Sequence, residues 1–168
     1  MRKLFNRKNR LALPARPDKI PIVQADSKTP AAGKLLVVDD NPIVQRTVYF
    51  ALRDAGFQVL MAGDISDAMK LIRREQPDLI LLDLSFPLDA GNINGPLQDG
   101  FFVIDWIYRT PEVKKSPVII ISSTAPAEYQ ERAAAAGVRA CFQKPLDKEK
   151  LVASVQAILG GQKIGTKK

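Results

Sequence analysis

Short apolar runs alternate along the chain with segments in which apolar residues recur at helical spacing. The apolar runs lie at residues 35–38, 57–61, 79–82, 118–121 and, more weakly, 138–142. The first four are rich in β-branched residues or leucine and show no polar alternation, which is typical of parallel strands covered on both faces. The pattern therefore predicts five mostly buried strands.

The segments between these runs are predicted helices. They lie at residues 42–55, 64–74, 101–108, 127–136 and 148–159. In the first, Asn41 is a plausible N-cap, Pro42 suits the first helical position, and Gly56 marks the end. Regular alternation of strand and helix predicts an α/β fold, an open parallel sheet with helices on both faces. Right-handed crossovers then favour the flavodoxin-like (βα)5 topology with strand order 2-1-3-4-5.

Charge divides the chain into three parts. Residues 1–30 carry eight Lys and Arg against two Asp, together with four prolines and no sustained periodicity. We expect a basic, disordered N-terminal arm over 1–32, one domain over 33–160 and a short basic tail over 161–168. The arm is either a solubilising tail or a weak electrostatic contact to nucleic acid or an anionic membrane surface.

Composition excludes several classes of site. The chain has no histidine and a single cysteine, Cys141. Histidine bases, histidine-dependent triads, imidazole zinc sites and internal disulfides are therefore excluded. No apolar run is long enough to span a bilayer and no secretory signal follows the basic start, so we expect a cytoplasmic protein.

Polar residues stand at the carboxyl ends of four predicted strands. Asp39 and Asp40 follow the first strand, Asp83 the third, Ser122 the fourth and Lys144 the fifth. Ligands of such sheets bind beyond these strand ends, so the five side chains should converge. Three converging carboxylates repel one another unless a cation neutralises them, and Mg²⁺ suits oxygen ligands. This set can carry phosphoryl transfer to a carboxylate. Alternatively, the first two carboxylates only cap a helix and the third belongs to an ordinary loop.

The segments LLVVDDNP, LILLDLSFP, VIIISS and CFQKP, in this order and spacing, resemble the receiver domain of CheY-like two-component response regulators. The resemblance covers about residues 33–160. It implies a receiver that accepts a phosphoryl group from a histidine kinase or phosphotransfer protein and signals through changed contacts with an unidentified protein target. It implies neither a small-molecule substrate nor conventional enzyme activity. The few residues after 159 leave no room for an output domain, so we expect a stand-alone receiver.

The resemblance also implies which residues bind the Mg²⁺ ion that phosphoryl transfer requires. Asp83 would be the phosphoacceptor and a ligand of the Mg²⁺ cofactor, and Asp40 would be a direct ligand. Asp39 would contribute to the metal site, and the backbone carbonyl of Ser85 would supply a further ligand.

Other positions would bind the phosphoryl group or adjust its lifetime. Ser122 and Lys144 would contact its oxygens, and the peptide bond between Lys144 and Pro145 would be cis. Ser85 and Thr124 occupy the positions that tune dephosphorylation in this family.

The chain departs from the family pattern in three features, one of which is that Ser85 and Thr124 are both small and polar. Cys141 occupies the switch position, which is usually aromatic, and the neighbouring Phe142 should face the other side of the sheet. Residues 84–99 form a long loop that could cover the site, contact a partner or be a tolerated insertion. An adaptor that acts without phosphorylation therefore remains an alternative, as does binding through the arm, gated by the receiver.

Overall fold

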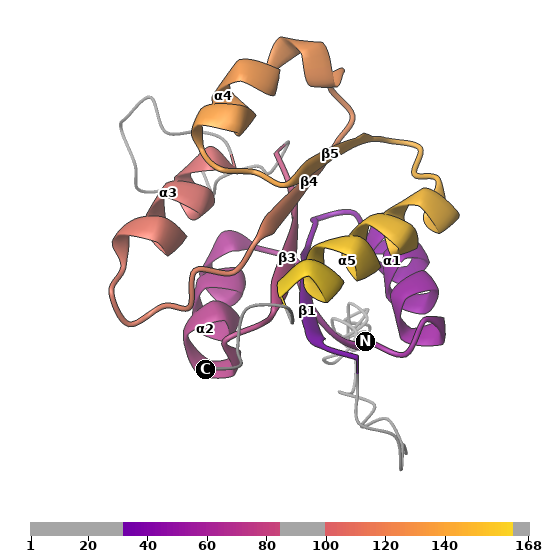
Figure 1. Ribbon diagram of the computed structural model, residues 1–168, viewed down its shortest axis with the longest axis horizontal. Coiled ribbons are helices and arrows are strands. Elements are labelled where there is room, and N and C mark those ends of the chain that lie inside the picture. The colour runs from indigo at the N-terminus through magenta and orange to yellow at the C-terminus, as the bar shows by residue number, and fades with distance from the viewer. Residues whose placement is uncertain (1–31, 85–99, 163–168) are drawn as a thin grey trace, which may run out of the picture.

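The computed structural model describes residues 32–84 and 100–162, in which strands and helices alternate as predicted (Figure 1). The predicted arm up to residue 31, loop residues 85–99 and the tail from residue 163 lie outside this description. The elements, in chain order, are β1 (Lys34–Val38), α1 (Pro42–Asp54), β2 (Gln58–Ala62), α2 (Ile65–Glu75), β3 (Leu79–Asp83), α3 (Phe101–Arg109), β4 (Val118–Ser122), the 3-10 helix η1 (Pro126–Glu128), α4 (Gln130–Ala135), β5 (Ala140–Gln143) and α5 (Lys148–Gln162). None of the helices in the described ranges is both long and apolar enough to cross a bilayer.

The five strands form one parallel sheet in the order β2-β1-β3-β4-β5, which confirms the predicted topology. The register aligns the carboxyl ends of the three central strands. Val38 of β1 pairs with Leu82 of β3, and Asp83 pairs with Ile121 of β4. The residues that directly follow these positions are therefore gathered at one edge of the sheet.

The sheet separates two apolar cores. Successive side chains of a strand point to opposite faces, so Leu36 and Val38 pack toward α2, α3 and α4, whereas Leu35 and Val37 pack toward α1 and α5. Figure 1 shows the two groups of helices on opposite sides of the sheet. Every residue of β3 and β4 is buried, as expected for strands covered on both faces.

Helix α1 begins with the cap that the sequence predicts and is fastened to the sheet by a buried glutamine. The side chain of Asn41 accepts a hydrogen bond from the backbone N–H of Ile43 at 2.9 Å. The amide nitrogen of Gln45 donates to the backbone carbonyls of Asp39 at 2.7 Å and Ala62 at 2.8 Å. Gln45 therefore links α1 to the ends of β1 and β2, a role that its sequence position did not reveal.

The helix predicted over residues 127–136 is interrupted. The structure has the short 3-10 helix η1, then Tyr129 with a non-helical ψ of 3° and φ of −132°, then α4. Pro126 opens η1 because it has no backbone N–H to donate. Tyr129 leaves the helical conformation and its side chain is buried, so packing overrides the local helical pattern at this point.

Candidate functional site

Three carboxylates meet at the carboxyl edge of the sheet. Asp39 and Asp40 follow β1 and Asp83 ends β3, and ligand oxygens of all three lie within 4.8 Å of one another. Asp39 is 0% exposed and Asp83 is 2% exposed, while Asp40 is open to solvent. The structure thus brings together the acidic residues that the sequence singled out.

Lys144, directly after β5, places its ammonium group between two of these carboxylates. Its Nζ lies 2.7 Å from Oδ2 of Asp39 and 2.6 Å from Oδ2 of Asp83. The backbone N–H of Lys144 also donates to the carbonyl of Ser122 at 2.8 Å, which fixes the end of β5 against β4. The Lys144–Pro145 peptide bond is cis.

Burial and the contacts between Lys144 and the carboxylates act in opposite directions on the pKa of Asp39, and also on the pKa of Lys144. Burial raises the pKa of Asp39, and the negative charge of Asp83 adds to this effect, so together they outweigh Lys144 and the backbone N–H of Asn41. Burial alone would lower the pKa of Lys144, but its contacts with Asp39 and Asp83 outweigh burial and raise it. The lysine therefore stays protonated and compensates part of the acidic charge.

The charge left over fits a divalent cation. Three ionised carboxylates and one ammonium group leave a net charge of −2, and the donors are all carboxylate oxygens, which hard cations such as Mg²⁺ prefer. Apart from the ammonium group of Lys144, the buried Oδ2 of Asp39 has no polar partner among the residues that the structure describes, so it retains capacity for a further contact. Asp39, Asp40 and Asp83 are thus suited to hold Mg²⁺. Ser85, whose carbonyl was predicted as another ligand, lies outside the described residues.

Ser122 ends β4, the strand between those that carry Asp83 and Lys144. Its side chain is fully buried, and its hydroxyl oxygen accepts a hydrogen bond from the backbone N–H of Thr124 at 3.1 Å. Ser122 therefore lies at the same edge of the sheet as Asp83 and Lys144. Its hydroxyl also stabilises the turn that leads toward η1.

The start of α3 approaches the same strand end very closely. A Cβ atom added at Gly100 would lie 2.7 Å from the backbone carbonyl oxygen of Asp83, which is closer than real Cβ contacts. Only a glycine allows this approach without a shift of the backbone. The sequence shows a glycine at this position, but the need for it comes from a contact that only the folded chain reveals.

Cys141, in β5, faces the apolar core on one side of the sheet. It is half-buried and packs against the core of α2, α3 and α4, whereas Phe142 packs against the core of α1 and α5. The two side chains thus occupy opposite faces, as strand alternation predicts. The face of Cys141 also holds Tyr129, a buried residue that the sequence analysis did not single out.

Comparisons with known proteins agree with this geometry. A family model described as the response regulator receiver domain matches residues 35–156. The protein PilH of Pseudomonas aeruginosa is 30% identical over 129 residues, which cover 77% of this chain and 99% of PilH. The crystal structure of the chemotaxis response regulator CheY4 of Vibrio cholerae is 27% identical, covers 77% of this chain and 99% of its own, and has a TM-score of 0.61. A CheY-like receiver domain protein from Methanospirillum hungatei, 20% identical, shares the fold with a TM-score of 0.65 over 79% of this chain and 98% of its own.

Proposed function

The chain belongs to the response regulator receiver domain family, and from this premise we propose that Asp83 accepts a phosphoryl group in a reaction that requires Mg²⁺. The observation that carries the proposal is the contact of one lysine with two buried carboxylates beside a third, exposed carboxylate. We propose a histidine kinase or a phosphotransfer protein as the donor. The phosphorylated form would then act through changed contacts with a protein target that remains to be identified.

The transfer itself needs little from the protein beyond position and charge. A carboxylate oxygen of Asp83 forms a bond to phosphorus while the bond from phosphorus to the donor's leaving group breaks. The ammonium of Lys144 already lies 2.6 Å from Asp83. It would shift toward the negative charge of the added phosphoryl group and pair with one of its oxygens. When bound by Asp39, Asp40 and Asp83, Mg²⁺ would supply further positive charge to the transferring group.

Two other residues complete the proposed arrangement. The hydroxyl of Ser122 is suited to donate to a phosphoryl oxygen because it ends the strand between β3 and β5. The start of α1 offers an exposed surface next to the site for the donor protein, since Ile43 is 73% exposed. These roles follow the family pattern, and the positions of both residues support them.

Intact-protein mass spectrometry tests the proposal directly. The purified chain is incubated with acetyl phosphate with and without Mg²⁺, alongside Asp83→Asn and Asp105→Asn. We expect one phosphoryl adduct that requires Mg²⁺, persists in Asp105→Asn and is absent from Asp83→Asn. Asp105 is the matched control because it is an exposed carboxylate that pairs with Arg109 on α3, away from the three carboxylates.

A folded protein that takes up no phosphoryl group from several donors would contradict the proposal. That result would favour the adaptor alternative, to which the replacement of the usual aromatic residue by Cys141 lends weight. Deletion of residues 1–30 combined with a salt titration would then test binding through the basic arm, because nonspecific contacts to polyanions weaken steeply with salt.

A further inference from the structure

The hydroxyl group of Tyr129 is buried in the core. The residue is 8% exposed, and its hydroxyl oxygen has no hydrogen-bond partner among the residues that the structure describes. Buried tyrosine hydroxyls normally find one, because a desolvated and unpaired polar group is unfavourable. A rearrangement that hydrates or pairs this hydroxyl therefore has a built-in driving force.

The side chain lies in the core between the sheet and the helices α2, α3 and α4. Leu84, the residue after Asp83, packs against this core, and so does Cys141 of β5. Burial, together with smaller contributions from the charges of Cys141 and Asp83, raises the pKa of Tyr129 to about 12. The tyrosine is thus within electrostatic reach of the proposed phosphoacceptor.

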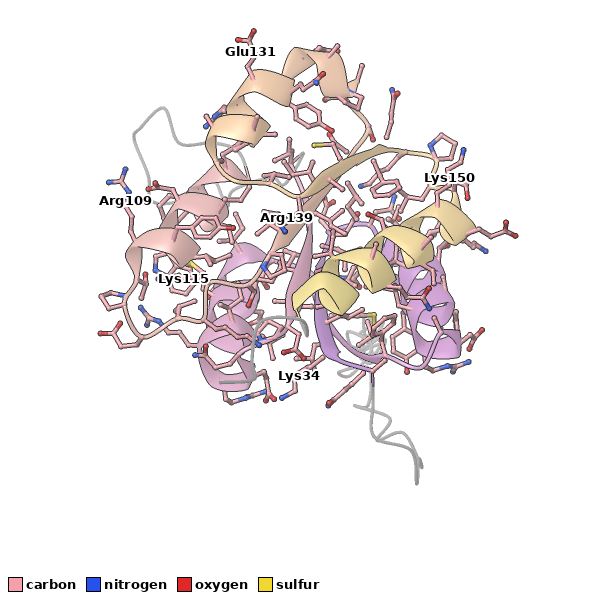
Figure 2. All side chains as sticks on the ribbon, viewed as in Figure 1. Lys34, Arg109, Lys115, Glu131, Arg139 and Lys150 are labelled. Atoms are coloured by element: carbon pink, nitrogen blue, oxygen red, sulfur yellow. The ribbon has the colours of Figure 1, made fainter. Side chains whose placement is uncertain are left out.

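Tyr129 is also one of the two buried residues in the segment that contains α4. Between residues 123 and 137, the buried residues are Tyr129 and Ala133. Helix α4 has six residues, and Tyr129, which stands at its N-terminus, makes no capping hydrogen bond with its side chain. Figure 1 shows α4 at the outer margin of the fold, and Figure 2 shows Glu131 pointing away from it into solvent. Loss of the tyrosine from its place in the core would remove the larger of these two buried side chains and loosen the helix, which keeps the contact of Arg132 with the ring of Phe101.

Short-range hydrogen bonds hold both ends of the segment that runs from the site to Tyr129. The hydroxyl of Ser122 accepts from the N–H of Thr124 at 3.1 Å. The N–H of Tyr129 donates to the carbonyl of Pro126 at 3.1 Å, and the N–H of Ala133 donates to the carbonyl of Tyr129 at 2.9 Å. A ligand that engages the Ser122 hydroxyl therefore acts at Thr124, on the segment that leads to Tyr129.

We propose that Tyr129 is a positioning residue: its side chain leaves its present place when a phosphoryl group occupies the Asp83 site, and its movement releases α4 from the sheet. The inference rests on the proposed function. A ligand shifts a conformational equilibrium only if it binds the two states differently, and the unpaired hydroxyl disfavours the resting state in advance. Tyr129→Phe removes the unpaired hydroxyl, so it should stabilise the resting conformation and weaken binding of a ligand at the Asp83 site.

The experiment uses the full chain labelled with 3-fluorotyrosine, and Mg²⁺ with beryllofluoride as the phosphoryl mimic. The chain has three tyrosines, Tyr49, Tyr108 and Tyr129, so fluorine NMR gives three assignable resonances. We expect beryllofluoride to shift the resonance of Tyr129 while that of Tyr49 on α1 stays in place. Bound beryllofluoride has its own fluorine resonance, which reports occupancy of the site independently.

Two unlabelled variants complete the test. Tyr129→Phe should bind beryllofluoride at least about fivefold more weakly than the wild type, in line with the usual penalty of an unpaired buried hydroxyl. Tyr108→Phe, which removes a tyrosine hydroxyl on α3 from a side chain that is 37% exposed, should leave the affinity unchanged.

The outcomes separate the two proposals. A bound beryllofluoride resonance with an unmoved Tyr129 resonance overturns the inference and leaves the proposed function standing. Unchanged affinity in Tyr129→Phe, even with a higher Tm, also overturns it, because the hydroxyl would then be only a local packing defect. Absence of any bound resonance overturns the proposed function, and the inference falls with it.

Discussion

Lys144 contributes most directly to the charge balance among the described residues of the site. Its ammonium group contacts two carboxylates that are almost fully buried, and its own side chain is only 15% exposed. Removal of one partner from a buried ion pair leaves the other charge desolvated and uncompensated. The site is therefore arranged for ligand binding at some cost in stability, and the lysine limits that cost.

Lys144→Met should lower the free energy of unfolding by about 3 kcal/mol in the absence of divalent cations. Saturating Mg²⁺ should return much of this loss, since a ligand that binds only the native state stabilises it. Urea unfolding with EDTA and with Mg²⁺ measures both effects.

Lys150→Met is the matched control, because this lysine forms a surface ion pair with Asp147 and is 78% exposed. Exposed pairs contribute little, so its change should stay within about 0.5 kcal/mol. Equal behaviour of the two variants would show that Lys144 does not compensate the buried carboxylates.

At the scale of elements, the close approach of α3 to the end of β3 restricts the backbone next to Asp83. Helix α3 starts so close to the carbonyl of Asp83 that there is no room for a side chain at Gly100. The backbone angles of Gly100 are those of an ordinary helix, with φ of −57° and ψ of −14°, so the constraint is one of space and not of conformation.

Gly100→Ala should therefore destabilise the protein by about 1–3 kcal/mol, the usual cost of overpacking. The added methyl group would push α3 and the Asp83 backbone apart, so the yield of the phosphoryl adduct should fall as well. Thermal unfolding and intact mass measure these two changes.

Gly160→Ala in α5 provides the comparison, because a Cβ there would have no atom of another described segment within 4 Å. It should raise stability by about 0.5–1 kcal/mol through the better helix propensity of alanine. A Gly100→Ala variant as stable as Gly160→Ala would show that the close approach to Asp83 does not exist in solution.

Elements with strong local signals were predictable from the sequence. The five apolar runs correspond to the five strands, and the Asn41–Pro42 pair marks the start of α1 as its side-chain chemistry suggests. The interruption before α4 was not predictable, since the apolar spacing of residues 127–136 is helical throughout. It depends on burial of Tyr129 by residues far away in the chain.

The same division holds within the candidate site. Asp39, Asp83 and Lys144 could be named because parallel strands bring their carboxyl ends together, whatever the intervening sequence. Gln45 and Gly100 could not, because their roles come from the backbone carbonyls that face them in the folded chain. Periodicity indicates which face a residue occupies, but not which polar atom it meets there.

At the scale of the whole molecule, a second polar cluster lies at the opposite edge of the sheet from the carboxylate site. Asp78 accepts a hydrogen bond from the backbone N–H of Lys34 at 2.8 Å and pairs with the ammonium group of Lys114. The hydroxyl of Ser116 donates to the carbonyl of Pro77. These contacts tie together the starts of β1 and β3 and the segment before β4.

Burial would raise the pKa of Asp78, but the hydrogen bonds from Lys114 and from the backbone of Lys34 outweigh it and hold that pKa below the ordinary value of 3.8. A carboxyl group with a lowered pKa in the folded state contributes stability above its unfolded pKa, and this contribution is lost as the pH falls through the folded pKa. Asp78→Asn should therefore be less stable than the wild type at pH 7, and the difference should shrink below pH 3.8.

Urea unfolding of both proteins between neutral pH and about pH 3, below the ordinary range of carboxyl groups, checks this expectation. Asp54→Asn, which changes an exposed carboxylate paired with Arg53, serves as the control and should follow the wild type throughout. A difference between Asp78→Asn and the wild type that stays constant with pH would mean that the hydrogen bonds matter and the charge does not.

The sequence distance between the site's acidic and basic parts has a consequence for the chain during its synthesis. The carboxylates that follow β1 and end β3 leave the ribosome before Lys144, which comes 61 residues after Asp83. At about 5–20 residues per second, translation separates the two by roughly 3–12 s. For that interval the emerging acidic cluster has no lysine beside it, so only protons or dissolved cations can neutralise it. The concentration of free Mg²⁺ in the cell should therefore influence how early during synthesis β1 and β3 can pair.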